Sequence, residues 1–220
     1  MLSSGVVATC MTRVLLADDH PLLRNGLKQV LTQEPDLEVV GEAEDSEQVL
    51  RQVEETPCDV LVLDLTMPGR GGLDVLRDIR RQHPDLPILI LSMHAENQFA
   101  VRAIKAGANG YLSKDNAGTE VVKAIRKVLT GKKYVSPSLA EMLANALDQD
   151  TERPPHASLS DREFQVLCKI ASGMTVSQIA EEISLSVKTI STYRSRVLEK
   201  MNMHNNAELT RYAIQSGLVG

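Results

Sequence analysis

Short apolar runs alternate, over roughly the first 130 residues, with longer segments whose apolar positions recur every three or four residues. Runs of about 4–8 residues rich in Val, Ile and Leu are typical of β-strands, and the recurrence between them is typical of helices. This alternation predicts successive strand–helix–strand units around a parallel sheet. The expected strands are RVLLA (13–17), LEVVGEA (37–43), DVLVLD (59–64), PILILS (87–92) and GYLS (110–113).

Two of these runs, VLVL at 60–63 and ILIL at 88–91, are apolar at every position. A strand is apolar on both faces when helices cover both sides of its sheet. The segment after the first run predicts one such helix, with Pro21 near its start, where the missing N–H costs no hydrogen bond. The buried face of this helix is expected to include Leu23, Leu27, Val30 and Leu31.

The pattern changes after Gly131. Residues 138–147 predict one more helix, and the polar stretch at 148–158 contains two prolines and no periodicity, as linkers do. The remainder predicts four helices and no strand. We therefore expect an N-terminal extension (1–11), a sheet domain (12–132), a linker with one helix (133–158) and a small all-α domain (159–220).

Composition excludes several classes of protein. The chain has 220 residues, of which 43% are apolar and 24% charged, which is long enough for two small globular domains. Its three cysteines are far apart and show no metal-ligand spacing, so we expect neither a disulfide framework nor a zinc site. No apolar run approaches the about 18 residues of a membrane span. We expect a cytoplasmic protein without a membrane partner.

Charge is distributed unevenly between the two parts. Residues 1–150 carry 16 basic against 22 acidic side chains, whereas residues 151–220 carry 8 against 7. The first part is therefore strongly acidic and the second slightly basic. If the protein meets nucleic acid, the second part is the one that does so.

Polar side chains follow four of the expected strands at the point where each strand ends. They are Asp18 and Asp19, Asp64, Ser92 and Lys114. Any one of them alone would be interpreted as a polar residue that only marks the end of a strand. Ligands of open parallel sheets, however, bind outside the carboxyl ends of the strands, so four such ends predict one site.

Three neighbouring carboxylates repel one another unless a cation neutralises them. An all-oxygen site that retains water suits Mg²⁺ better than Zn²⁺. Together with the positive charge of Lys114, such a site offers what phosphoryl transfer requires. Asp64, in the middle of the group, is the natural acceptor.

The second part predicts a helix-turn-helix. Ser160 and Glu163 form a capping-box pattern at the start of one helix, and 175–183 and 187–201 predict two more helices separated by a tight turn. The residues expected to pack these two helices together are Ile179, Ala180, Ile183, Leu185, Val187, Ile190 and Val197.

The outer face of the helix at 187–201 is basic and rich in hydroxyl groups. Between 188 and 201 there are four basic residues and one acidic residue, Glu199. A solvated face of a small bundle is the plain alternative. Basic side chains beside short hydroxylated ones favour DNA binding, because such side chains approach phosphates and base edges.

The strand-end residues lie in motifs that resemble the receiver domain of two-component response regulators, over about residues 12–132. The motifs are DDH (18–20), DLTMP (64–68), LSMHA (91–95) and GYLSK (110–114). The resemblance implies a flavodoxin-like (CheY-like), doubly wound, five-stranded parallel α/β fold. It also implies that a histidine kinase donates the phosphoryl group.

The resemblance assigns a role to each of these residues. Asp64 is the phospho-acceptor, and Mg²⁺ is held by Asp18, Asp19, Asp64 and the backbone carbonyl of Thr66. Ser92 is the hydroxyl that follows the phosphoryl group, Lys114 is the phosphate-pairing lysine, and Tyr111 is the aromatic switch.

One position departs from the family pattern. Many receivers have a cis proline after the lysine, whereas Asp115 follows Lys114 here. A cis bond to a non-proline residue costs about 3 kcal/mol, so either strain is tolerated or the bond is trans.

A phosphatase of the haloacid-dehalogenase type is a rival interpretation of the acidic site, but that motif requires a second Asp where this chain has Thr66. A receiver-like domain that no longer accepts phosphate is another interpretation, although none of the expected pocket residues is missing.

The stretches LSDREFQVL, IAEEISLSVKTISTYRSRVLEKM and NNAEL resemble the LuxR-type helix-turn-helix, over about 156–220. The resemblance places Ser191, Thr192 and Ser195 at base-facing positions and makes Lys188, Tyr193, Arg194 and Arg196 mainly phosphate contacts. Short side chains give weak direct readout, so DNA shape or bridging water is expected to contribute specificity.

Both resemblances together indicate a NarL/FixJ-type response regulator, a transcription factor and not a turnover enzyme. Phosphorylation of Asp64 is expected to change the surface around the helix at about 96–106, which then either dimerises or releases the DNA-binding helices. A homodimer on promoter DNA is expected, with the last helix (206–216) contributing to both core and dimer. The alternative function is a phosphate-independent DNA-binding scaffold.

Overall fold

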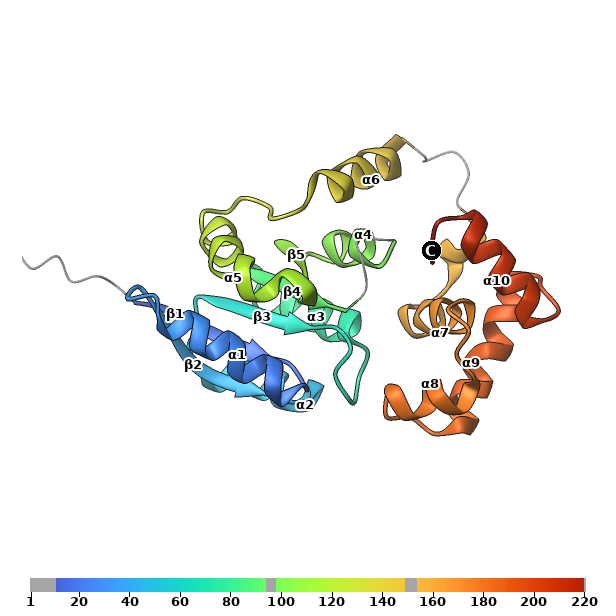
Figure 1. The fold of residues 1–220 in the computed structure, drawn as a ribbon, viewed down its shortest axis with the longest axis horizontal. Helices are drawn as coiled ribbons and strands as arrows, with labels where there is room; N and C mark the ends of the chain where they lie inside the picture. The colour runs from blue at the N-terminus through green and yellow to red at the C-terminus, as the bar shows by residue number, and fades with distance from the viewer. Residues whose placement is uncertain (1–10, 94–97, 149–153, 220) are drawn as a thin grey trace, which may run out of the picture.

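The structure, a computed structural model, describes residues 11–93, 98–148 and 154–219. Figure 1 shows two domains joined by one helix. The expected extension at 1–10, which includes Cys10, lies outside the described residues, as do 94–97 and 149–153. Within the described ranges, no helix has both the length and the apolar character needed to cross a membrane.

A five-stranded parallel sheet in the order β2-β1-β3-β4-β5 forms the centre of the first domain. This order confirms the expected doubly wound fold, and each strand begins and ends within one residue of its predicted bounds. The strands are β1 (Thr12–Ala17), β2 (Leu37–Ala43), β3 (Val60–Asp64), β4 (Ile88–Ser92) and β5 (Gly110–Ser113).

Helices cover both faces of the sheet. Successive strand residues point to opposite sides, so each face has its own set of apolar side chains for the helices to cover. On one face, Val14, Leu16 and Val62 pack with α1 (Pro21–Thr32) and α5 (Lys114–Leu129). On the other face, Leu15, Leu61 and Leu63 pack with three further helices. These are α2 (Ser46–Glu55), α3 (Gly72–Gln82) and α4 (Gln98–Lys105).

The buried face of α1 differs from the predicted one. Leu27 and Leu31 are buried as expected, whereas Leu23 and Val30 are only partly buried against the same core. Arg24, which was not among the residues expected on the buried face, is also buried. The reason is that its guanidinium finds partners on other segments, which local periodicity does not reveal.

The second part of the chain is helical, as predicted. The linker contains α6 (Pro137–Asp148) and a short 3₁₀ turn, η1 (Pro155–Ser158), in a stretch that predicted no regular structure. The domain beyond it consists of α7 (Asp161–Ala171), α8 (Val176–Glu182), α9 (Val187–Lys200) and α10 (Asn206–Gln215). Its core is formed by fully buried side chains, among them Phe164, Leu167, Ile190, Val197 and Leu209.

Capping residues define the starts of these helices. The capping box of Ser160 and Glu163 at α7 is present as predicted, and Thr175 and Gln178 form a second one at α8 that sequence inspection missed. Ser186 caps α9, which makes Val187 its first residue. The prediction that Val187 packs between α8 and α9 is wrong, because its side chain lies at the solvent-facing start of the helix and is 50% exposed.

Candidate functional site

The carboxyl edge of the sheet brings together the side chains that the strand ends predicted. Lys114 Nζ lies 2.7 Å from Asp64 Oδ2 and 2.8 Å from Asp18 Oδ2. Asp64 is 0% exposed, Asp18 1% and Lys114 6%. Asp19 lies beside them, and one ligand atom from each of Asp18, Asp19, His20 and Asp64 falls within a 4.8 Å group. Three separate segments, 18–20, Asp64 and Lys114, therefore form one charged and largely buried pocket.

The electrostatics of the pocket follow from burial and charge. Desolvation disfavours the charged form of Lys114, but attraction by Asp64 and Asp18 outweighs it and raises the pKa of this ammonium group. Burial raises the pKa of the Asp19 carboxyl, and repulsion by Asp64 and Asp18 adds to that effect, although His20 and Lys114 oppose it. Lys114 thus stays charged, while the pocket resists a further negative charge.

Thr66 fixes the orientation of the Asp64 carboxylate. Its backbone N–H donates to Asp64 Oδ1 at 2.8 Å, and its hydroxyl oxygen lies 2.8 and 2.9 Å from the two carboxylate oxygens. Sequence reasoning gave Thr66 a role only through its carbonyl. Its side chain is therefore a contact that the strand-end pattern missed.

His20 is a second residue of the pocket without a predicted role. Its backbone N–H donates to Asp18 Oδ1 at 2.7 Å, and its ring nitrogen Nδ1 lies 2.7 Å from Asp19 Oδ1 and 3.2 Å from Lys114 Nζ. It stands immediately before α1, and its side chain caps no backbone group of that helix. The available signal was its place directly after the two aspartates.

The donor set of the pocket fits a hard divalent cation. All three carboxylates present oxygen, the ligand atom that Mg²⁺ prefers. Two buried oxygens, Asp18 Oδ2 and Asp19 Oδ1, receive no well-aligned hydrogen bond and are balanced only by ion-pair contacts with Lys114 and His20. Carboxylate oxygens in that condition are available to a metal ion.

Ser92 lies on β4, which pairs with β3, and Tyr111 lies on β5, the edge strand that pairs with β4. Ser92 is the last residue of β4 and is 0% exposed, and Tyr111 on β5 is 1% exposed, with Ile90 as its register partner on β4. Both side chains are therefore buried in the interior of the sheet domain.

The peptide bond between Lys114 and Asp115 is trans, which resolves the alternative left open by the missing proline. Lys114 is the first residue of α5, and Ser113 caps the helix by accepting a bond from the Asp115 N–H at 3.4 Å. A proline at 115 would lack that donor. The acidic Asp115 also lies in the first turn, where negative charge is favourable.

The outer face of α9 is accessible to a ligand. The expected base-facing residues Ser191, Thr192 and Ser195 are exposed, as are Lys188 and Arg196. The other two predicted contacts differ. Tyr193 and Arg194 are half-buried, and Arg194 Nε donates to Asn206 Oδ1 on α10 at 2.6 Å.

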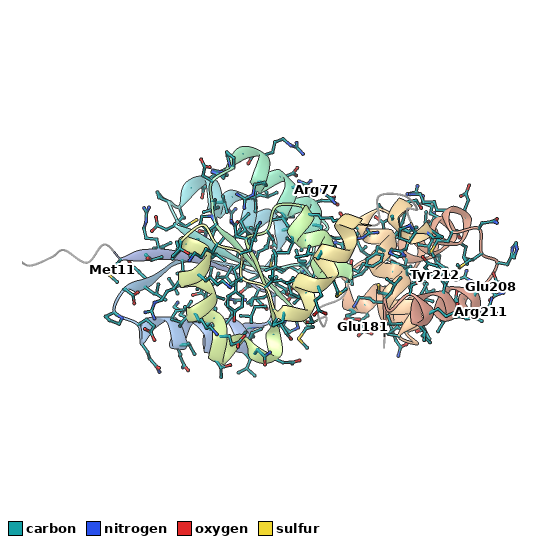
Figure 2. All side chains as sticks on the ribbon, turned by 90° about the horizontal axis from the view of Figure 1, so that it is seen from above. Met11, Arg77, Glu181, Glu208, Arg211 and Tyr212 are labelled. Atoms are coloured by element: carbon teal, nitrogen blue, oxygen red, sulfur yellow. The ribbon has the colours of Figure 1, made fainter. Side chains whose placement is uncertain are left out.

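The two domains contact each other through α7. Asp161 pairs with Arg77 of α3 and, at 3.3 Å, with Arg102 of α4. Figure 2 shows Arg77 on the side of the sheet domain that faces the helical domain, with Met11 at the opposite end. Arg162 Nη2 donates to the Gly69 carbonyl at 2.7 Å, in the loop that follows Asp64. Sequence patterns did not predict this contact.

Aromatic packing extends the same interface. Phe99 of α4 stacks with Phe164 of α7 at a centroid distance of 5.9 Å, and the Arg102 guanidinium lies 4.0 Å from the Phe164 ring centroid. Ser191 and Thr192 of α9 remain exposed while this contact is made. The docked arrangement therefore leaves these two side chains, which are predicted to face bases, uncovered.

Comparison with known proteins identifies both domains. Residues 14–126 match the model of the response regulator receiver domain, and residues 157–213 match that of bacterial regulatory proteins of the luxR family. The response regulator UvrY of Escherichia coli is 41% identical over 209 residues, which covers 94% of this chain and 96% of UvrY.

Two solved structures are similar over nearly the full length. RcsB from Salmonella enterica serovar Typhimurium, bound to the rprA promoter with the phosphomimetic BeF₃⁻, superposes with a TM-score of 0.64 at 30% identity, covering 92% of this chain and 98% of RcsB. A structure of two RcsB dimers on two parallel DNAs gives 0.56 at 30% identity, covering 93% and 98%. The chain therefore belongs to the NarL-type response regulators, two-component transcription regulators that join a receiver domain to a LuxR-type DNA-binding domain.

Proposed function

We propose that Asp64 accepts the phosphoryl group of this two-component regulator from a sensor histidine kinase. The observation that carries the proposal is the environment of Asp64, a buried carboxylate 2.7 Å from Lys114 Nζ and grouped with Asp18 and Asp19. A pocket of this kind is typical of the Mg²⁺ site of receiver domains. Mg²⁺ would be held by Asp18, Asp19, Asp64 and the carbonyl of Thr66.

The residues of the pocket supply most of what the transfer requires. A carboxylate oxygen of Asp64 attacks the phosphorus atom. The bond between phosphorus and the histidine nitrogen of the kinase breaks, and its electron pair stays on that nitrogen. An acyl phosphate results. The positive charge of Lys114 would balance negative charge on an oxygen of the transferred phosphoryl group, and Thr66 would orient the attacking carboxylate. Bound Mg²⁺ would neutralise further charge on the phosphoryl oxygens.

The new dianion then acts on the interior beside it. Ser92 and Tyr111 lie on β4 and β5, and α4 between these strands carries Phe99 and Arg102, which contact the helical domain. A shift of Ser92 and Tyr111 toward the phosphoryl group would alter this contact. We propose that phosphorylation thereby raises the affinity for promoter DNA, as a shift between existing arrangements of the domains.

The exposed face of α9 is the proposed DNA contact. Ser191, Thr192 and Ser195 would face base edges, and Lys188 and Arg196 would contact phosphates. Tyr193 and Arg194 would reach phosphates only from half-buried positions, and the bond of Arg194 to Asn206 would have to give way. We propose a homodimer on DNA, since a two-fold dimer matches two half-sites and RcsB dimers are seen on DNA.

The experiment measures DNA affinity against a site selected from random duplexes. Wild type and Asp64→Asn are compared with and without beryllofluoride and Mg²⁺, and light scattering gives the mass of each species. We expect tighter binding and a dimer only for treated wild type. Equal, tight binding by untreated wild type and by Asp64→Asn would instead establish the phosphate-independent scaffold.

A further inference from the structure

Arg24 is the one arginine of α1, and it is buried beside the acidic pocket. Its Nη1 donates to the backbone carbonyl of Asp18 at 2.6 Å. The other arms of the guanidinium reach two carboxylates at the end of β2 and just beyond it, with Nε 3.1 Å from Glu42 Oε2 and Nη2 2.5 Å from Glu44 Oε1. One side chain thus links three segments of the chain.

A buried guanidinium requires such partners. Removing an arginine from water has a large desolvation cost, which is offset only when its donors meet opposite charge or good acceptors. Glu42 and Glu44 provide the charge. The Asp18 carbonyl is a further acceptor, and through it the guanidinium is also tied to the backbone of the pocket.

The bond to Asp18 fixes the direction of the pocket's own backbone. The Asp18 N–H already donates to the Ala43 carbonyl at 3.0 Å, and Arg24 holds the Asp18 carbonyl on the other side. The peptides before and after Asp18 are therefore both anchored. The second of these peptides leads directly into Asp19, so its orientation sets where the Asp19 carboxylate points.

We propose that Arg24 is a positioning residue that pre-organises Asp18 and Asp19 for the metal ion. It touches neither the ion nor the reacting atoms. It acts through the Asp18 carbonyl, with Glu42 and Glu44 holding the guanidinium in place. The inference rests on the proposed function, because it deepens the account of the same Mg²⁺ site.

Lys28 provides a matched control on the same helix. Its Nζ pairs with Glu42 Oε1 at 2.5 Å, and between the described residues Lys28 and Asp18 there is no hydrogen bond or ion pair. Lys28→Ala therefore removes one cationic partner of Glu42 and leaves the pocket backbone anchored. Arg24→Ala removes the anchor itself.

The first experiment is calorimetric titration of the full chain with Mg²⁺. Loss of a group that orients a metal ligand typically weakens metal affinity about tenfold or more, and we expect a change of that size for Arg24→Ala. Lys28→Ala is expected to match wild type. An unchanged Mg²⁺ affinity in folded Arg24→Ala, or an equal loss in Lys28→Ala, would overturn the proposal.

The second experiment separates positioning from chemistry. The rate of phosphorylation by a small acyl phosphate is measured against Mg²⁺ concentration. Arg24→Ala should need about tenfold more Mg²⁺ for half its maximal rate, while the maximal rate at saturating Mg²⁺ stays near that of wild type. A fall in the maximal rate alone would contradict a role through Asp18 and Asp19.

Two further variants keep the test decisive if Arg24→Ala does not fold. Arg24→Lys retains the charge, but its compact ammonium group lacks the planar fork that reaches three separated acceptors, so it should recover only part of the Mg²⁺ affinity. The double variant Glu42→Gln/Glu44→Gln keeps the guanidinium and loosens its anchor, and it should weaken Mg²⁺ binding as well. Wild-type affinity in both variants would refute the proposal. Failure of wild type itself to bind Mg²⁺ would instead refute the proposed function.

Discussion

The charged pocket lowers the stability of the fold at neutral pH through Asp19. Asp19 is brought close to Asp18 and Asp64, and burial together with this repulsion raises the pKa of its carboxyl above the ordinary 3.8. The folded state then binds a proton more tightly than the unfolded state does. The favourable contribution of Asp19 is therefore complete only below its unfolded pKa and is lost as pH rises through the folded pKa.

This sign predicts a stabilising substitution. At pH 7 the charged Asp19 weakens the fold, so Asp19→Asn should raise the melting temperature by a few degrees, the shift produced by about 1 kcal/mol. The gain should shrink as pH approaches 3.8, where the wild-type carboxyl is increasingly neutral. Thermal unfolding followed by circular dichroism measures both effects.

Asp36 is the control for this prediction. Its carboxyl is hydrogen-bonded by Arg126, which lowers its pKa, so Asp36→Asn should not raise the melting temperature. A wild type more stable than Asp19→Asn at pH 7 without Mg²⁺ would show that the pocket is not under electrostatic strain.

Sequence inspection found the residues that belong to strand ends and missed those held by distant partners. Asp18, Asp64 and Lys114 were predictable because the carboxyl ends of parallel strands meet at one edge. Arg24 was not, because its acceptors Glu42, at the end of β2, and Glu44, just beyond that strand, are distant in the sequence. The side-chain role of Thr66 depends on the local geometry after β3, which no periodicity encodes.

The elements themselves were predicted closely where their pattern is strong. Strands β3 and β4 are buried throughout and apolar except for the polar residue that ends each, so their ends are sharply marked. The helix-turn-helix followed from the apolar spacing of its two helices and from the tight turn between them. The error at Val187 has a simple cause, since a residue at the first position of a helix is not yet held against the partner helix.

The exposed face of α9 predicts a specific salt dependence. Arg196 is exposed and is expected to contact a DNA phosphate. Arg196→Ala should weaken binding to all duplexes alike and reduce the slope of log K against log salt by about one. Fluorescence anisotropy at several salt concentrations measures this slope.

Arg211 on α10 is a matched control, because it is an exposed arginine on another helix (Figure 2). Arg211→Ala should leave the slope unchanged. An unchanged slope for Arg196→Ala, or an equal reduction for Arg211→Ala, would exclude α9 as the phosphate-contacting helix.

Over the whole molecule, the docking of α7 on α3 and α4 joins the sheet domain, which holds the acidic pocket, to the DNA-binding domain. Arg102 is the hub, since it donates to Asp161 and to the carbonyls of Leu159 and His156. These contacts join residues more than 50 positions apart, and no local pattern in the chain announces them. The domain arrangement was consequently the least predictable feature.

Loss of this hub should separate the domains. Arg102→Ala removes the donor of three hydrogen bonds to the helical domain, and it also removes the contact of the guanidinium with the Phe164 ring. We therefore expect a larger radius of gyration by small-angle scattering. Arg81→Ala, which removes only a pair with Asp78 on the same helix, should match wild type. Identical radii for wild type and Arg102→Ala would show that other contacts hold the domains.

Phosphorylation of Asp64 is tested most sharply by the mass of the intact protein after incubation with a small acyl phosphate and Mg²⁺. We expect wild type to gain one phosphoryl group, which peptide mapping after borohydride trapping should place on Asp64, and we expect Asp64→Asn to gain none. A wild type that stays unmodified while binding Mg²⁺, or a phosphoryl group found on another residue, would contradict it.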